Sequence, residues 1–246
     1  MTSDTSFAAQ IRGHLQQVAG LRTQAADTDR LAAVQAVKRL QAQRFRASYS
    51  DLSRSTRTQP ALRFFLDELY GEHDFSRRDE QFGRIAGALE RLFPAAVGQL
   101  AVDLTEMHAL TETLDHALAS HWQVLPAEAG SAERYILAWR RCGARRERER
   151  QLAVVQHMGA ELQRLTRMRS LRLGLRMMRK PAEAAGLDAL QHFLESGFDA
   201  FAALGDASSF LRTIAQREAQ WIETLFDAPL ADACHRLDVE LSRAAP

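Results

Sequence analysis

The chain has 246 residues and a formal net charge of +1, because 32 Lys and Arg balance 31 Asp and Glu. A chain of this length can bury a sizeable core without disulfides or metals, and its near-zero charge excludes a general attraction to nucleic acid. The 41 Ala and 32 Leu far outnumber the 14 Val and Ile, and this scarcity of β-branched residues predicts an all-α fold.

The N-terminal part of the chain alternates helical and polar stretches. Apolar residues recur at helical spacing over residues 5–47, which predicts two helices joined near Asp27. A polar stretch over residues 48–60 then interrupts the pattern. Pro60 suits the opening of the next helix, and Gly71 is well placed as its C-terminal cap.

The middle of the chain contains the longest helical patterns. Ser76–Asp79 forms a capping-box pattern at the start of a helix that Pro94 stops, and a long helix is expected over residues 95–122. Residues 123–132 are expected to be a loop between two halves of one bundle. A further helix is expected to continue from Tyr135 through Leu165.

The C-terminal part begins with an ambiguous segment. LRLGLRM alternates apolar and basic residues around Gly174, and we expect a helix there because an isolated strand would have no partner for its backbone groups. Two clear helices over about 187–204 and 210–225 are joined by a short turn, which predicts an antiparallel hairpin. With a final helix over about 230–242, we expect one domain over residues 1–246, a single bundle of roughly nine or ten helices.

Three polar residues of the long central helix could bind a metal ion. His108, Glu112 and His116 are spaced at i, i+4 and i+8, which offers two imidazoles and a carboxylate along one face. These residues lie roughly 100 to 180° from the apolar stripe through Met107 and Leu114, on the face expected to meet water. We therefore favour exposed polar residues over a metal site and expect no cofactor. Haem or small-ligand contact at His121 is a further alternative, although a histidine near a helix end is more ordinary.

The sequence contains no complete catalytic motif. A nucleophile elbow and a phosphate-binding loop are both missing, and neither Cys142 nor Cys234 lies in a catalytic signature. These two cysteines are too few and too far apart for a disulfide framework, which fits a reducing compartment. With no signal-like segment and no apolar stretch of about 18 residues, we expect a cytoplasmic protein without a membrane partner.

Acidic, basic and aromatic residues crowd together over residues 63–82. Such a mixture can line a polar pocket, or it can form a turn held by caps and ion pairs. We favour the second interpretation.

The most unusual feature is a basic segment. From Arg140 to Lys180 the chain carries 13 Lys or Arg against three Glu, a local charge of +10, and the rest of the chain sums to −9. Arginine recognises phosphate and carboxylate equally well, so an anion site is one hypothesis. Its candidate residues are Arg145, Arg146, Arg148 and Arg150. Interleaved glutamates and the absence of base-stacking aromatics favour pairing inside the bundle or between subunits instead.

Several segments together resemble a known family. FFLDELYG, DFSRRD, RRERERQ, PAEAAGLDALQHFLESGFDAF and FLRTIAQRE are similar to segments of an uncharacterised family of helical bacterial proteins, a domain of unknown function, over about residues 30–226. The resemblance implies a single cytoplasmic bacterial domain and implies no activity or catalytic residue.

The sequence favours a non-catalytic binding or scaffold protein over an enzyme. A second copy of the chain or another protein is the expected partner. Binding of nucleic acid or a phosphate-bearing anion through residues 140–150 is the first alternative, and a metal- or haem-binding bundle is the second.

Overall fold

The computed structural model describes residues 6–28, 30–69, 74–126, 128 and 130–243. These residues form thirteen α-helices and one π-helical turn, and no strand occurs among them. Their bounds are α1 Phe7–Asp27, α2 Leu31–Ser48, α3 Ser50–Ser53, α4 Gln59–Phe64, η1 Phe65–Leu69, α5 Ser76–Leu92, α6 Ala95–Gln123, α7 Ser131–Cys142, α8 Arg145–Thr166, α9 Arg169–Met177, α10 Arg179–Ala184, α11 Asp188–Leu204, α12 Ser208–Asp227 and α13 Leu230–Ser242. Within the described ranges all helices except α3, α4 and α10 have nine residues or more, and these longer helices number ten, as the sequence predicts.

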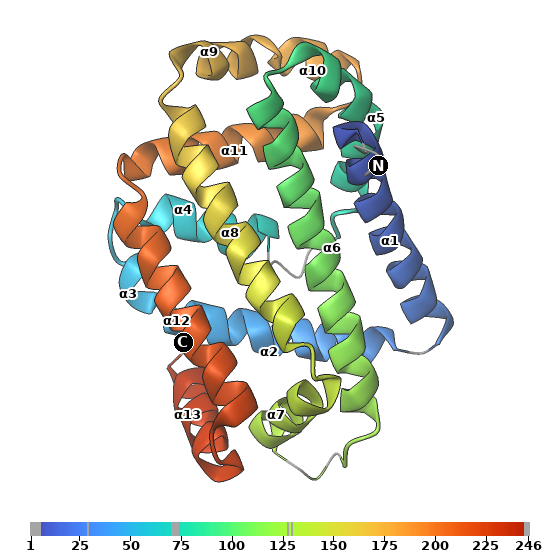
Figure 1. Cartoon of the computed structure of the whole chain (residues 1–246), viewed down its shortest axis with the longest axis vertical. Helices are drawn as coiled ribbons and strands as arrows, with labels where there is room; N and C mark the ends of the chain where they lie inside the picture. Colours follow the sequence, from blue (N-terminus) through green and yellow to red (C-terminus); the bar gives the residue numbers. More distant parts are fainter. Residues whose placement is uncertain (1–5, 29, 70–73, 127, 129, 244–246) are drawn as a thin grey trace, which may run out of the picture.

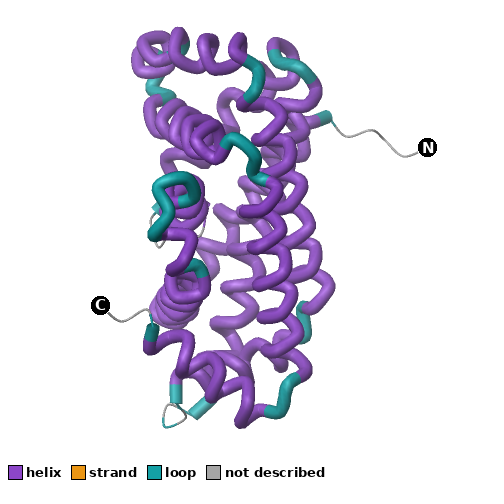
Figure 2. Tube along the Cα trace, turned by 90° about the vertical axis from the view of Figure 1, so that its left-hand side faces the viewer, coloured by secondary structure: helices purple, strands orange, loops and turns teal. Residues whose placement is uncertain are grey.

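The helices lie in two layers that cross one another. Helices α6 and α8 run side by side along the long axis of the molecule (Figure 1). Helices α11, α4 and α2 cross them at successive heights, and the view turned by 90° shows this second layer partly end-on (Figure 2). Because α1, α2, α7 and α8 all pack on α6, this helix is covered from several sides.

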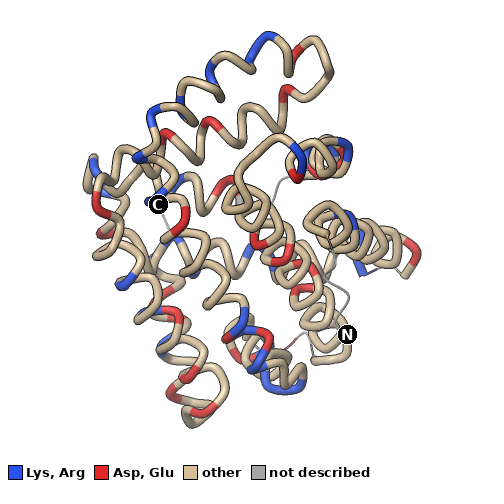
Figure 3. The backbone as a smooth tube through the Cα atoms, turned by 45° about the horizontal axis from the view of Figure 1, so that its top comes forward, with Lys and Arg blue, Asp and Glu red and all other residues tan. Residues whose placement is uncertain are grey.

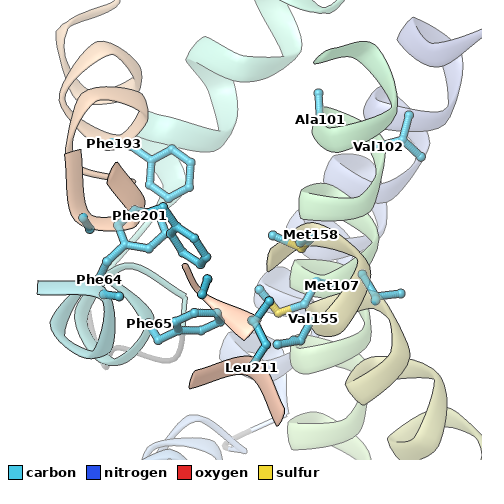
Figure 4. Close-up of a cluster of buried hydrophobic side chains, with 14 of the residues drawn as sticks. Phe64, Phe65, Ala101, Val102, Met107, Val155, Met158, Phe193, Phe201 and Leu211 are labelled. Atoms are coloured by element: carbon cyan, nitrogen blue, oxygen red, sulfur yellow. The ribbon is translucent and has the colours of Figure 1, made fainter. Parts of the chain in front are cut away.

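Two clusters of buried apolar side chains fill the space between the layers. The first contains Phe64 and Phe65 with Phe193 and Phe201 of α11, and these rings face side chains of α6, α8 and α12 (Figure 4). The second joins α2, the C-terminal half of α6, α7, the end of α12, and α13. Helices α6 and α12 supply residues to both clusters, and each cluster includes residues before and after the 123–132 segment.

One expected helix is two helices in the structure. The sequence predicts a continuous helix from Tyr135 to Leu165, but α7 ends at Cys142 and α8 starts at Arg145. Gly143 lies between them with φ +63°, a left-handed conformation that glycine adopts without steric cost. The prediction of one continuous helix is therefore wrong. Apolar residues recur at helical spacing both before and after Gly143, so periodicity alone did not reveal the glycine C-cap between the two helices.

The expected capping box at the start of α5 does not form. The carboxylate of Asp74 instead accepts hydrogen bonds from the backbone N–H and hydroxyl of Ser76. The side chain of Asp79 is buried and accepts a hydrogen bond from His108 of α6. Tertiary contacts thus replace the local contact that the sequence pattern predicts. The predicted cap at Gly71 lies outside the described residues.

The turn between α11 and α12 is a corner, so the predicted antiparallel hairpin is wrong. After the turn at Gly205, which has φ +68°, α12 leaves α11 and packs along α8 and α7 (Figure 1). The short connection fixes where α12 starts, whereas the apolar faces of α7 and α8 fix its direction.

The ambiguous LRLGLRM segment is helical, as expected, and lies within α9. This helix has no buried residue and rests on the edge of the second layer. Among the described residues, no helix combines the length and the apolar character needed to cross a bilayer.

Candidate anion-binding cavity

Three of the four arginines predicted to bind an anion lie at the surface of α8. Arg145 pairs with Asp227 of α12, and Arg150 forms a two-pronged pair with Glu106 of α6, with N–O distances of 2.6 and 2.8 Å. Arg146 is exposed. Arg145 and Arg150 are therefore already paired with carboxylates of the described chain.

The remaining basic segment is partly paired inside the molecule. Arg140 donates to backbone carbonyls at the end of α12, while Arg172 and Arg179 pair with Asp199 and Glu195 of α11. Figure 3 shows basic positions along α9 and α10 beside acidic positions on α11. Such exposed pairs contribute at most about 1 kcal/mol each. Pairing within the bundle therefore accounts for part of the +10 segment.

Arg148 differs from the other arginines of α8 because it is buried. Its exposed fraction is 7%, and its guanidinium lies 4.1 Å from the centre of the Trp139 ring. Its hydrogen bond to Gln151 is long, at 3.5 Å, and no carboxylate of the described chain lies within 4.0 Å of it. A buried cation without an adjacent carboxylate is unfavourable, so its position requires an explanation.

A partly open cavity of about 40 Å³ lies beside Arg148 and is lined by residues of α2, α7, α8 and α12. One water needs roughly 10 to 15 Å³ of such volume, so the cavity has room for a group of a few non-hydrogen atoms. Its lining combines polar and aromatic side chains: Gln41, Arg44, Phe45, Tyr135, Trp139, Arg148, Gln151, Leu152, Glu218 and Ile222.

Several hydrogen-bond donors of the lining residues have no partner in the described part of the chain. The indole Nε1 of Trp139 and the Nε of Arg44 are both buried and unpaired. Burial raises the pKa of Tyr135 to about 12, so its hydroxyl keeps its proton and can also donate. Unpaired buried polar groups are rare in folded proteins, and two of the five in the described chain belong to neighbouring walls of this cavity.

The single carboxylate of the lining is already neutralised. Glu218 accepts two hydrogen bonds from Arg44, at 2.9 and 2.7 Å, and a third from the hydroxyl of Tyr49. Burial lowers the pKa of Arg44, but the adjacent Glu218 outweighs burial and raises it, so the pair stays ionised. Arg148 is therefore the one charged lining residue without an ion-pair partner within 4.0 Å in the described chain.

The two glutamines of the lining are held in place by α6. Gln41 donates to Asp115 at 2.9 Å, and Gln151 donates to Thr111 at 2.7 Å. Burial raises the pKa of Asp115, while the positive charges of Lys38 and Arg148 oppose this shift, so Asp115 acts on Arg148 from beyond ion-pair distance. The amide groups of both glutamines are thus fixed by contacts outside the cavity.

The residues predicted as an unlikely metal site are buried, so the prediction that they face water is wrong. His108, Glu112 and His116 have exposed fractions of 5%, 3% and 4%, because other helices cover this face of α6. His108 contacts Asp79 at 3.0 Å, whereas Glu112 contacts Lys38 at 2.6 Å. His116 contacts Glu112 at 3.7 Å within α6 itself, so the structure brings these two side chains together, whereas His108 contacts α5.

The carboxylate of Glu112 is surrounded by positively charged and hydrogen-bonding groups. Burial raises its pKa, but His116 and Lys38 outweigh burial and lower it to about 2. Lys38 already supplies the positive charge at this carboxylate. Within the described residues, no three or more His, Cys, Asp or Glu are arranged to hold a metal ion. His121, the alternative haem contact, is partly buried near the end of α6.

Where the structure describes it, the mixed acidic and basic segment over residues 63–82 is a turn stabilised by hydrogen bonds and ion pairs. Arg78 donates to the backbone carbonyl of Glu68 and stacks on Phe75 and Phe193, and Arg77 pairs with Asp188. These contacts are the caps and ion pairs that the sequence favours. Residues 70–73 lie outside the described chain.

Sequence reasoning identified Arg148 but missed the other cavity residues. Arg44, Tyr135 and Trp139 come from two helices that are distant in sequence, and no local motif connects them. One signal was present. Gly143 separates Trp139 from Arg148, and a helix break there allows these two side chains to meet.

Comparison with known proteins gives a family without an assigned activity. The pattern of the family described as Domain of unknown function (DUF8198) matches residues 20–231. No curated protein and no solved structure matches the chain.

Proposed function

This chain belongs to the DUF8198 family, and for it we propose the function of a non-catalytic binding protein that holds an anionic group of its ligand in the cavity beside Arg148. The observation that carries the proposal is the buried guanidinium of Arg148, which lacks the adjacent negative charge of a carboxylate within 4.0 Å in the described chain. An anion in the cavity would supply that charge.

The chemistry of the lining supports binding in preference to catalysis. The unpaired groups are hydrogen-bond donors on Arg44 and Trp139, and the carboxylate of Glu218 accepts hydrogen bonds from Arg44 and Tyr49. Fixed donors around a small cavity bind an acceptor-rich group, as in other ligand sites with few placed polar groups. The cavity residues provide no free base beside a nucleophile.

The test compares thermal unfolding with and without small anions. We expect at least one of the sodium salts of acetate, nitrate, chloride, phosphate and sulfate, at constant ionic strength, to raise Tm by about 5 to 10 °C at ~100 times its Kd. Arg148→Met should abolish the shift, while Arg146→Met on the exposed face of the same helix should retain it. The proposal fails if no anion stabilises the native chain more than the Arg148→Met variant.

A further inference from the structure

We infer that the anion is a planar monocarboxylate with a short apolar tail, an inference that rests on the proposed anion-binding function and specifies its ligand class. The inference stands on three properties of the cavity: its one arginine without an ion-pair partner, the chemistry of its unpaired donors, and its size and walls.

The charge of the lining matches a monoanion. Glu218 neutralises Arg44 through two hydrogen bonds, so Arg148 remains as one positive charge. A dianion such as hydrogen phosphate would leave one negative charge buried without a counter-charge, which is strongly unfavourable. A monoanion leaves the cavity neutral.

The free groups match a planar carboxylate. Arginine presents a planar fork that pairs with both oxygens of a carboxylate. Trp139 stacks on this fork at 4.1 Å, which limits movement of the guanidinium out of its plane, and its own Nε1 is an additional buried donor. The Nε of Arg44 is a second unpaired donor.

The remaining walls accept a short alkyl group. Phe45, Leu152 and Ile222 contribute apolar surface, and the volume of about 40 Å³ suits a head group with one or two carbons. Each buried methylene adds about four-fold in affinity, from about 0.8 kcal/mol. Affinity should therefore rise from formate to acetate to propionate.

The experiment measures the Kd of the full chain for formate, acetate, propionate, nitrate, chloride and phosphate by titration calorimetry. We expect propionate to bind at least ten-fold more tightly than phosphate and several-fold more tightly than formate or nitrate. Trp139→Phe keeps the aromatic wall but removes the N–H donor, and should weaken propionate binding by ten-fold or more. Arg146→Met is the matched surface control and should leave every Kd unchanged.

Arg148→Lys tests the planar shape of the guanidinium apart from its positive charge. The lysine keeps a positive charge but cannot pair with both carboxylate oxygens in one plane, so the preference for propionate over chloride should fall at least ten-fold. Thermal unfolding of each variant identifies any that does not fold, and the Kd series of the native chain is decisive alone.

The possible results separate the two proposals. Tightest binding of phosphate or sulfate, lost in Arg148→Met, would leave the anion-binding function standing and overturn the carboxylate inference. Equal affinities along the formate, acetate and propionate series would overturn the apolar tail. Absence of binding by every anion would overturn both.

Discussion

Arg148 shows that the burial of an arginine depends on which face of the helix it occupies. It lies in a run of arginines that share the same local sequence, yet it is buried at the side of Trp139 while Arg146 is exposed. The buried guanidinium has no carboxylate within 4.0 Å in the described chain, whereas Arg44 across the cavity is paired with Glu218. These two buried arginines should therefore respond oppositely to substitution.

Arg148→Met should leave the free energy of unfolding unchanged or raise it by about 1 kcal/mol in buffer without small anions, because an uncompensated buried charge is replaced by an apolar side chain. Arg44→Met should lower it by about 3 to 5 kcal/mol, because Glu218 would lose its counter-charge. Urea denaturation at pH 7 measures both. A large loss of stability in Arg148→Met would mean that its charge is compensated within the protein.

Glu112 should make stability depend on pH in a defined range. Its pKa in the folded protein is about 2, below the ordinary value of 4.5, because His116 and Lys38 outweigh burial. Its stabilising contribution, about 3 kcal/mol, is complete above pH ~4.5 and is lost as the pH falls toward 2. The difference in unfolding free energy between the native chain and Glu112→Gln should therefore shrink from pH 5 to pH 2.5 in urea titrations. Glu149→Gln, at an exposed position, is the control, and a constant difference for Glu112→Gln would contradict the prediction.

At the scale of helices, close contacts depend on specific glycines. A Cβ added to Gly197 of α11 would lie 2.7 Å from the Phe64 ring, in the buried contact between α11 and α4. A Cβ added to Gly13 of α1 would meet no atom within 4 Å. Both glycines lie inside helices, so a change to alanine affects helix propensity at both positions but adds a packing clash only at Gly197.

Gly197→Ala should lower the free energy of unfolding by about 1 to 3 kcal/mol through overpacking, whereas Gly13→Ala should raise it by about 0.5 to 1 kcal/mol through reduced backbone entropy of the unfolded chain. Chemical denaturation of the two variants and the native chain provides the measurement. Equal effects of the two substitutions would show that α11 can move away from Phe64 at little cost.

Helix α9 illustrates the opposite case, an element that contributes little to the core. It has no buried residue, and Leu173 and Met177 are 61% and 69% exposed. Leu173→Glu should change the unfolding free energy by less than about 0.5 kcal/mol, while Leu204→Ala in α11 should cost about 2 to 5 kcal/mol. A cost above 1 kcal/mol for Leu173→Glu, measured by urea denaturation, would show that this face of α9 is covered in solution.

At the scale of the molecule, the two core clusters should unfold together. Helices α6 and α12 contribute residues to both clusters, so loss of one cluster would expose apolar faces in the other. All three tryptophans lie in or against the second cluster, so tryptophan fluorescence reports that cluster while far-ultraviolet circular dichroism reports every helix. For a single domain, the two probes should give coincident urea transitions. Separate midpoints would divide the chain into two folding units.

The amino-acid sequence by itself determined the helical class and most helix ends. Leucine and alanine at helical spacing leave few alternatives to helices, and local signals such as Pro60 and Pro94 mark their starts. Even the ambiguous segment in α9 follows from the requirement that backbone groups be hydrogen-bonded.

The tertiary structure alone decided which polar side chains are buried and which charges are paired. Periodicity placed His108, Glu112 and His116 opposite an apolar stripe, and it could not show that neighbouring helices would cover that opposite face as well. The cavity likewise depends on Gly143, which ends α7 and allows Trp139 to meet Arg148, and on α2 and α12, which bring Arg44 and Glu218 from distant parts of the chain. Helix propensity is set by neighbours within a few residues along the chain. Burial and charge pairing depend instead on contacts between helices, and the sequence pattern does not show which helices meet.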